Sequence, residues 1–419
     1  MLKTNDIIML RDFKQLFIKS ICTASMLITL AILPAQVLAM TPELYGAVAD
    51  DGVDDTEALQ AAIDNHDEVF LRGRYQISSK ITLRSNLHVY SDGIGGIHLT
   101  SRGGFDNSAA NIEFADNAIA LSGENIENVR LRNFVVTKDF QDGSNVSAVR
   151  IRGGENIVVN GLDISGFSNG LVIALDSVQW ASIESNWVHG SFTNSEIQHT
   201  AIAIDSSRLI RNGEILNSSA VMVQNNFVFG LQVSQSLRNR QRVETDGINI
   251  AGPEAHDIWL VNNAIARVGE GIDSFGQRVS VRRNMLFDNY IFGIKLIHGA
   301  SHNVVKDNDI LRAAKAGIVL AGSTSVSRDT SSNAVIENSI RAVGQNTEIN
   351  WRPQVTAGIS LESNGGTTGN VVGNLISENL IANNTQADFG VHCDVPFSNQ
   401  ISNTNIQDQP IREGVLSCP

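Results

Sequence analysis

Three acidic residues and one lysine stand at matching places in short glycine-containing strings of this 419-residue sequence. The strings are Thr245-Asp246-Gly247-Ile248, Glu270-Gly271-Ile272-Asp273 and Gly293-Ile294-Lys295-Leu296. Carboxylates that lie close together repel each other unless a cation or protonation relieves them, and a cluster of carboxylate oxygens suits Ca²⁺. If the strings are neighbours in space, they predict a cation-binding cluster of Asp246, Glu270 and Asp273 with Lys295 beside it.

The strings belong to a longer series of repeats. A glycine precedes a short, mostly apolar, strand-like segment at six places, with spacings of 24, 22, 24, 41 and 32 residues: Gly247, Gly271, Gly293, Gly317, Gly358 and Gly390. A basic period of 22–24 residues is too short for a propeller blade, and strands repeated in this way stack in parallel, one rung on the next. From about Asn111 onward the sequence therefore predicts an all-β fold, a single-stranded parallel β-helix.

Strand alternation predicts which side chains share a face. The isoleucine directly after each of the first glycines faces the interior, so the next residue faces outward. Asn249, Asp273 and Lys295 then share one outer column on rungs about 4.8 Å apart, and Asp246 and Glu270 converge on the same place. An alternative is that Asp273 and Lys295 form a ladder pair on a solvated face, which needs no function.

Asparagines recur in the predicted turns, where their amides can bond to each other along the stack. They are Asn226, Asn263, Asn284, Asn308, Asn338 and Asn374. We interpret them as structural rather than as sugar ligands.

The N-terminal segment has the composition of a signal peptide. Residues 1–39 carry basic residues, then an apolar stretch from Ile21 to Leu33 and small residues up to a predicted cleavage near Ala39. The apolar stretch is shorter than the ~20 residues that a membrane-spanning helix needs. We therefore expect a secreted or periplasmic, monomeric protein without membrane association after signal removal, with residues 40–419 as a single domain.

Charge and cysteine content limit the partners further. Against 31 Lys and Arg stand 44 Asp and Glu, a net charge of −13 that argues against nucleic acid as a partner. Cys393 and Cys418 remain in the mature chain. They could pair in an exported protein, but two separate buried thiols are equally compatible with their spacing.

Residues 40–80 are predicted to cap the open end of the solenoid. Asp54 or Asp55 can cap a helix with an apolar face, which would cover strand edges that otherwise aggregate. That face consists of Ala58, Leu59, Ala62 and Ile63. The segment from Tyr45 to Ile63, with its Gly-Ala, Asp-Gly and Asp-Asp-Thr elements, resembles the start of many members of the pectate lyase (pectin lyase-like) superfamily. The resemblance implies a right-handed β-helix with an N-terminal capping α-helix.

The three strings resemble those of the calcium-dependent family 9 polysaccharide lyases. In that family, Asp-Gly on one rung and Asp-Gly-x-Asp on the next bind Ca²⁺, and the lysine of a Gly-Phe-Lys-Leu string is the base. The resemblance implies that Asp246, Glu270 and Asp273 hold Ca²⁺ and that Lys295 abstracts the C5 proton of a uronate. The sequence departs from the family pattern at Gly269, where an acidic residue is usual, and at Glu270, where aspartate is usual.

A hydrolase is the first alternative. Thr245-Asp246-Gly247 and Gly269-Glu270-Gly271 are similar to strings of polygalacturonase-type glycoside hydrolases, with Asp246 and either Glu270 or Asp273 as base and acid. Half of that pattern is missing, because Gly271 replaces one carboxylate and Ile294 stands where a histidine is expected. A C5-epimerase and a non-catalytic glycan-binding β-helix are further alternatives.

Other polar residues are candidates for binding an acidic polysaccharide. Arg238, Arg240 and Arg242 would present three cations on one face of an extended segment that leads to Asp246. Asn249 and His298 flank the acidic cluster and Lys295 in sequence. The sequence as a whole predicts a secreted lyase that cleaves a uronic-acid-containing polysaccharide, such as pectate or alginate, by β-elimination.

Overall fold

The computed structural model of the chain describes residues 40–93, 95–99, 119–138, 147–167, 170–190, 192–193, 199–206, 209–211, 214–233, 245–323, 326–344, 355–363, 369–384, 387–395 and 398–407. The predicted signal peptide (1–39), the strip of Arg238, Arg240 and Arg242, and Cys418 lie outside these residues. Cys393 is disulfide-bonded, so of the two alternatives for this cysteine the structure favours pairing. Among the described residues, no helix combines the length and the apolar character needed to cross a membrane.

Three long parallel sheets form the body of the unit Met40–Pro419. Sheet A consists of β1 (Glu68–Phe70), β4 (Leu87–Tyr90), β7 (Glu127–Arg132), β10 (Glu155–Asn160), β13 (Gln179–Glu184), β19 (Ser219–Gln224), β23 (His256–Val261), β26 (Gln277–Arg282), β29 (Val304–Lys306), β33 (Ala334–Ile336), β37 (Leu375–Ser377) and β40 (Gln400–Ser402). Sheet B consists of β2 (Arg74–Ile77), β5 (Gly96–Leu99), β8 (Val135–Lys138), β11 (Asp163–Ser165), β14 (Trp187–His189), β20 (Phe227–Phe229), β24 (Ala264–Ala266), β27 (Met285–Phe287), β30 (Asp309–Leu311), β34 (Ser339–Arg341), β38 (Leu380–Ala382) and β41 (Asn405–Ile406). Sheet C consists of β3 (Ile81–Thr82), β6 (Ile119–Glu124), β9 (Ser147–Arg152), β12 (Leu171–Asp176), β16 (His199–Asp205), β22 (Thr245–Ile250), β25 (Glu270–Ser274), β28 (Phe292–Leu296), β31 (Ala316–Ala321), β35 (Ala357–Glu362) and β39 (Phe389–Asp394).

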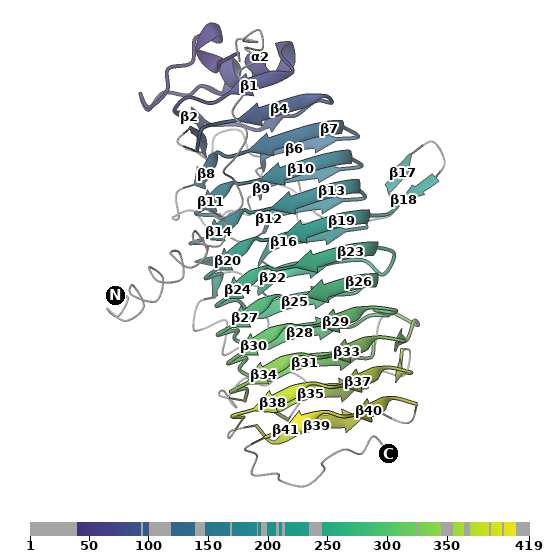
Figure 1. Cartoon of the computed structure of the whole chain (residues 1–419). Helices are drawn as coiled ribbons and strands as arrows, with labels where there is room; N and C mark the ends of the chain where they lie inside the picture. The colour runs from purple at the N-terminus through teal and green to yellow at the C-terminus, as the bar shows by residue number, and fades with distance from the viewer. Residues whose placement is uncertain are drawn as a thin grey trace, which may run out of the picture. The chain divides into compact units, whose positions relative to one another are not determined.

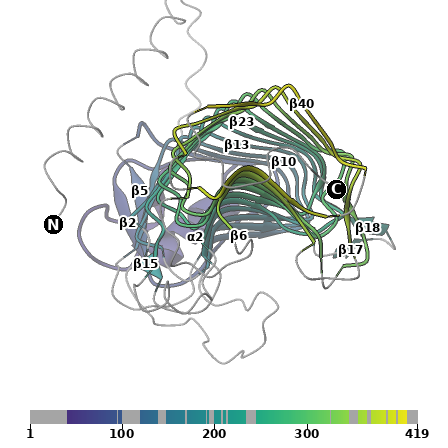
Figure 2. The same cartoon turned by 90° about the horizontal axis from the view of Figure 1, so that it is seen from below.

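Successive coils each contribute one strand to each sheet, and the strands stack directly on those of the preceding coil (Figure 1). Seen along the stack, the coils superimpose around one interior (Figure 2). The predicted all-β, right-handed parallel β-helix is therefore confirmed. Three short pairs lie outside the sheets: β15 (Phe192–Thr193) with β21 (Gln232–Val233), β17 (Leu209–Arg211) with β18 (Glu214–Leu216), and β32 (Thr330–Ser331) with β36 (Val371–Val372).

The six aligned glycines lie on six consecutive strands of sheet C, from β22 to β39. The isoleucines after the first five of them and Val391 after the sixth pair in register and are buried in one continuous core. Glycine is required by close packing: a Cβ on Gly271 would lie 2.3 Å from Leu286 Cδ2 and 2.5 Å from the carbonyl oxygen of Gly293 on the next rung. Each repeat in the sequence thus corresponds to one coil of the β-helix.

Amide ladders run along two corners of the coil. Seven asparagines form the first, each Nδ2 donating to the next Oδ1 at 2.9–3.0 Å: Asn186, Asn226, Asn263, Asn284, Asn308, Asn338 and Asn379. All six predicted asparagines bond to other asparagines along the stack, five of them in this ladder. Asn374 belongs instead to a second ladder with Asn333 and Asn399, because it precedes a strand of sheet A and not of sheet B.

The N-terminal cap has the predicted helix. A 3₁₀ turn, η1 (Pro42–Tyr45), precedes α2 (Thr56–Asn65), whose buried residues are Ala58, Leu59, Ala62 and Ile63. Asp54 Oδ1 accepts the Thr56 N–H at 3.0 Å, and the carboxylate of Asp55, the N-cap residue, accepts the Val48 N–H at 3.0 Å. Because α2 contacts β1, β2 and β3, the first strand of each sheet, it covers the end of the stack (Figure 1).

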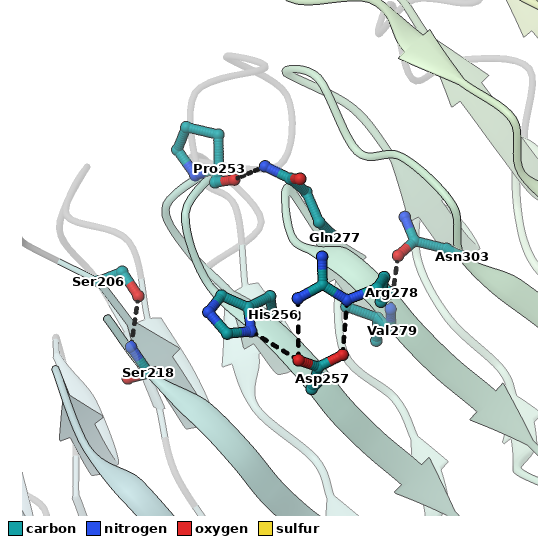
Figure 3. A network of polar contacts seen from close by, with 9 residues as sticks. All are labelled: Ser206, Ser218, Pro253, His256, Asp257, Gln277, Arg278, Val279 and Asn303. Carbon is teal, nitrogen blue, oxygen red and sulfur yellow. Dashed lines mark hydrogen bonds and ion pairs between the residues drawn. The ribbon is translucent and has the colours of Figure 1, made fainter. Parts of the chain in front are cut away.

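The turn from sheet C to sheet A after β22 is fixed by polar contacts across two coils (Figure 3). Arg278 binds both carboxylate oxygens of Asp257 at 2.7 and 2.8 Å, and His256 Nδ1 lies 2.8 Å from Asp257 Oδ2. The hydrogen bond from Arg278 is the main cause that lowers the pKa of Asp257 to about 2. Gln277 Nε2 donates to the carbonyl of Pro253 at 2.7 Å. These contacts fix the path of the chain directly after the strand that carries Asp246 and Asn249.

Candidate active site

Three neighbouring strands of sheet C place the candidate residues together. On β22, β25 and β28, Asp246 pairs in register with Glu270, and Asn249 pairs with Asp273, which in turn pairs with Lys295. The glycine of each string and the isoleucine after it both face the interior, so alternation is interrupted at the glycine. The residue before the glycine and the second residue after it therefore lie on the same outer side. The predicted column of Asn249, Asp273 and Lys295 is present in the structure, and Asp246 and Glu270 lie beside it.

Polar contacts join these five residues into one cluster. Lys295 Nζ lies 2.8 Å from Glu270 Oε2 and 3.4 Å from Asp273 Oδ2. Asn249 Nδ2 donates to Asp246 Oδ2 at 3.2 Å and to Asp273 Oδ2 at 3.4 Å. Lys295 and Asn249 thus bridge the three acids from two sides.

The cluster is buried, which argues against the alternative of a ladder pair on a solvated face. Asp246 and Glu270 are 0% exposed, Asp273 is 1% exposed, and Lys295 retains 8%. Removing one partner of a buried ion pair typically costs about 3–5 kcal/mol, whereas exposed pairs contribute about 0–1 kcal/mol. Lys295 and its two acids therefore interact strongly, and Lys295 is the most solvent-accessible of the four charged groups.

The donor set fits a hard divalent cation. Each of the three acids offers one carboxylate oxygen that lies within 4.8 Å of those of the other two. With Lys295 charged, three carboxylates and one ammonium leave a formal excess of two negative charges in a buried site, and Ca²⁺ is bound by such oxygen ligands. The residues present therefore fit the metal that the sequence analysis predicts, with Asp246, Glu270 and Asp273 as its ligands.

Thr200, on the preceding strand β16, was not predicted from the sequence. Thr200 pairs in register with Asp246, is fully buried, and donates from Oγ1 to Asp246 Oδ2 at 3.1 Å. The alignment on glycines could not find this strand, because Ala201 stands where the later strands have glycine. A search for the alternating Ile202 and Ile204 would have added it to the repeats.

The predicted substrate-binding residues have different outcomes. Asn249 lies within the cluster, as described above. His298 lies beyond the end of β28, with Nδ1 2.7 Å from Ser323 Oγ and its ring edge-on to Phe275 at 4.7 Å between ring centroids. These contacts direct the His298 ring toward Ser323 and Phe275. The arginine strip at residues 238–242 lies outside the described residues and stays a prediction.

Two titratable groups on β16 have strongly shifted pKa values in opposite senses. Burial lowers the pKa of His199, which is 0% exposed, to about 4, although its Nδ1 lies 2.8 Å from the Gly170 carbonyl. Burial and the neighbouring carboxylate of Asp176 raise the pKa of Asp205 to about 6. Both groups therefore link the stability of the strand that carries Thr200 to pH.

We expect His199→Gln to make the protein less sensitive to acid. The unfolded chain binds the proton of His199 below a pKa of about 6.5 and the folded chain only below about 4, so stability falls as pH drops between these values, by up to about 3 kcal/mol. Urea unfolding midpoints, measured at several pH values between about 4 and 6.5, should not show this loss of stability in the variant.

Asp205→Asn is the matched variant, and we expect it to change the pH dependence of stability in the opposite direction. The raised pKa of Asp205 stabilises the folded state at low pH, and that contribution is lost as pH rises through about 6. Removing the carboxyl should therefore steepen the loss of stability on acidification. Parallel pH profiles for wild type and both variants would contradict this assignment.

Comparisons place the fold among known structures. No protein-family model and no curated protein matches the sequence. The A-module of the mannuronan C-5 epimerase AlgE6 of Azotobacter vinelandii superimposes with a TM-score of 0.60 at 16% identity, over 90% of this chain and 99% of that one. The surface protein and adhesin PfbA of Streptococcus pneumoniae superimposes with a TM-score of 0.56 at 16% identity, over 88% and 99%. A tailspike protein of E. coli bacteriophage HK620, solved with a pentasaccharide, gives 0.58 at 15% identity, over 85% and 62%. The chain therefore shares the parallel β-helix fold of these proteins.

Proposed function

We propose that this protein is a calcium-dependent lyase that cleaves a uronic-acid-containing polysaccharide by β-elimination. The observation that carries the proposal is the placement of Lys295 Nζ within 3.4 Å of two of three clustered, buried carboxylates. A polysaccharide substrate is supported by the proteins of the same fold, which include a mannuronan epimerase and a tailspike solved with a pentasaccharide.

Asp246, Glu270 and Asp273 would hold the cation. When bound, Ca²⁺ would neutralise the carboxylate of a uronate and so make its C5 proton more acidic. Asn249 and Thr200 keep Asp246 oriented through hydrogen bonds to the same oxygen, Oδ2, at 3.2 and 3.1 Å. In this mechanism Thr200 and Asn249 act as positioning residues for the ligand Asp246.

Lys295 would act as the base. Carboxylates at 2.8 and 3.4 Å favour the ammonium form of its amine, whereas a divalent cation held by those carboxylates would favour the neutral form. The neutral Nζ then accepts the C5 proton, the C4–O bond breaks with its electron pair leaving on the glycosidic oxygen, and a C4–C5 double bond forms. The leaving oxygen takes up a proton from water, and Lys295 returns the abstracted proton to solvent, so that atoms and charge balance.

The geometry favours this chemistry over inverting hydrolysis. Inverting hydrolases keep their two carboxyl groups about 6.5–9.5 Å apart to leave room for a water molecule. One carboxylate oxygen from each of Asp246, Glu270 and Asp273 lies within 4.8 Å of the other two, which suits a shared cation better. A C5-epimerase is the second candidate, because it begins with the same proton abstraction and a mannuronan C-5 epimerase has this fold.

An absorbance assay tests the proposal. The protein is incubated with pectate, alginate and other uronans, each with Ca²⁺ and with chelator, while absorbance of the C4–C5 double bond and the number of reducing ends are followed. A calcium-dependent rise of both is expected. Reducing ends without absorbance would identify a hydrolase, and exchange of the C5 proton with deuterated solvent without cleavage would identify an epimerase.

A further inference from the structure

A column of uncharged side chains runs along the outer face of sheet A, away from the site on sheet C. It begins on the coil after Arg130, and its members pair in register over eight successive strands, from β10 to β37 (Figure 1). Their neighbours along each strand are buried in the core, so by alternation the column faces outward. The column consists of Val158, Ser182, Met222, Trp259, Ser280, Val304, Ala334 and Leu375.

Two tryptophans project from this face. Trp259, within the column, is 40% exposed, and Trp180, two residues before Ser182 on β13, is 66% exposed. On β19, the strand between those of the two tryptophans, Ala220 and Met222 occupy the corresponding places. A contiguous exposed apolar surface of this kind marks a binding site more often than a single exposed side chain does. We call the column, with Trp180 and Ala220, the sheet A stripe.

Charged side chains bound the sheet A stripe on both sides. Two residues before the column lie Asp257 and Arg278, which bind each other at 2.7 and 2.8 Å (Figure 3). Two residues after the column lie Glu184, Arg282 and Lys306. Over most of its length the stripe is therefore only one column wide, about 7 Å, and its seven steps of about 4.8 Å make it about 34 Å long.

These dimensions suit a single extended polymer better than a folded partner. They correspond to a footprint of roughly 240 Å², whereas a stable protein–protein interface buries about 800 Å² on each partner. An added polypeptide strand would need the unpaired backbone groups that the edge of a sheet supplies. The stripe lies instead on a face of sheet A, where each strand is hydrogen-bonded to its neighbours in the sheet.

A polysaccharide has the matching chemistry. The C–H groups on the face of a sugar ring are apolar and carry a small positive charge, so they pack favourably on the negative face of an indole ring. Hydroxyl groups lie beside the large side chains of the stripe, because Ser182 pairs in register with Met222 and Ser280 pairs with Trp259. Such hydroxyls can exchange hydrogen bonds with those at the edge of a sugar ring.

We infer that the sheet A stripe is a second polysaccharide-binding surface, which holds an extended chain along the solenoid by the faces of its sugar rings, with Trp180 and Trp259 as the main contacts. The inference goes beyond the proposed function, because binding here needs neither the cation nor Lys295. Since the stripe carries no charged side chain, salt should not weaken this binding. The surface would keep the protein on a polymer while the site on sheet C acts on it.

Binding to immobilised polymers tests the inference. Lys295→Arg protein in chelator is applied to surfaces coated with polygalacturonate, polymannuronate or the neutral polymer glucomannan, so that no chain is cleaved and no cation contributes. We expect at least one polymer to bind with an affinity that high salt does not reduce. Replacing both Trp180 and Trp259 by alanine should lower that affinity about tenfold or more. Binding to none of the polymers would overturn the inference.

Two further variants separate stacking from general stickiness. Trp259→Tyr keeps an aromatic ring and should retain most of the affinity that Trp259→Ala loses. Leu44→Ala is the matched control, because Leu44 on the capping turn η1 is also 66% exposed and lies outside the stripe. It should leave the affinity unchanged, and an equal loss in this variant would count against the stripe. All four variants should melt near the background protein, because the replaced side chains are exposed.

The outcomes separate this inference from the proposed function. If wild-type protein forms the double bond on a uronan but the double tryptophan variant binds polymers as tightly as its parent, the stripe is wrong and the lyase stands. If no uronan yields a double bond while polymer binding depends on both tryptophans, the stripe stands and the lyase is wrong. Self-association in sedimentation velocity that Trp259→Ala abolishes would assign the stripe to a second copy of the chain and overturn the inference.

Discussion

Lys295→Arg should lower the rate of uronan cleavage by about 10²–10⁴-fold, the range that a positioned general base contributes. A guanidinium remains protonated under all assay conditions, so it can keep the ion pair with Glu270 and Asp273 but cannot accept the C5 proton. The loss should lie in kcat more than in KM, because binding of the uronate to the cation is unaffected. Initial rates from double-bond absorbance measure both.

Arginine is the informative replacement because the site is buried. Lys295→Ala would leave Glu270 and Asp273 buried without the lysine ammonium, at a cost of about 3–5 kcal/mol of stability. A loss of activity in that variant could therefore come from a missing base or from unfolding. Lys306→Arg is the matched control: Lys306 makes an ion pair of the same length, 2.8 Å, with Glu337, but this pair is exposed on sheet A. The control variant should keep wild-type kcat.

A Lys295→Arg protein with an unchanged rate would remove lysine as the base. A variant that is inactive and also melts well below wild type would leave the base unassigned, and calcium binding by the folded fraction would then decide whether the cluster is intact. The clean result is a protein that unfolds near the wild-type temperature, binds Ca²⁺ and forms no double bond.

The sequence predicted the architecture well because packing in this fold requires particular residues at every coil. A Cβ at Gly271 would collide with the next rung, so glycine recurs with the period of the coil and marks the strands of sheet C. Where this requirement lapses, the prediction fails: Ala201 takes the place of glycine on β16, and Thr200 with its bond to Asp246 was missed. The recurrence of the asparagines predicted that their amides bond along the stack, but it does not tell which corner of the coil each occupies, and Asn374 lies in a second ladder.

For the site, the sequence predicted which residues meet but not their environment. Strand alternation placed Asp273 and Lys295 side by side on the outer side of the sheet, as the structure shows. Whether that side meets solvent depends on what packs over it, and a period of two residues carries no information on this point. The burial that turns an ordinary ladder pair into a strongly coupled cluster therefore emerged only from the structure.

Calcium should raise the melting temperature of wild-type protein, and Asp273→Asn should remove most of that rise. A ligand at 100 times its Kd adds about 2.7 kcal/mol to the free energy of unfolding, which corresponds to a rise of several degrees. Asp273 supplies one of three carboxylates within 4.8 Å of one another, so its loss removes both a ligand and a charge from the site. Thermal unfolding with a series of Ca²⁺ concentrations and with chelator measures the effect without any substrate.

The direction in which Asp273→Asn shifts the melting temperature in chelator distinguishes a metal site from a structural ion pair. Without a cation, three buried carboxylates repel one another and Lys295 offsets only one of them, so Asp273→Asn should melt at or above the wild-type temperature. If Asp273 mattered only as a partner of Lys295, its replacement would lower the melting temperature equally with and without Ca²⁺. Asp307→Asn, at an exposed turn, is the control that should change neither value. Stabilisation of the chelated variant together with loss of the calcium response is expected only if the cluster of Asp246, Glu270 and Asp273 is built to hold a cation.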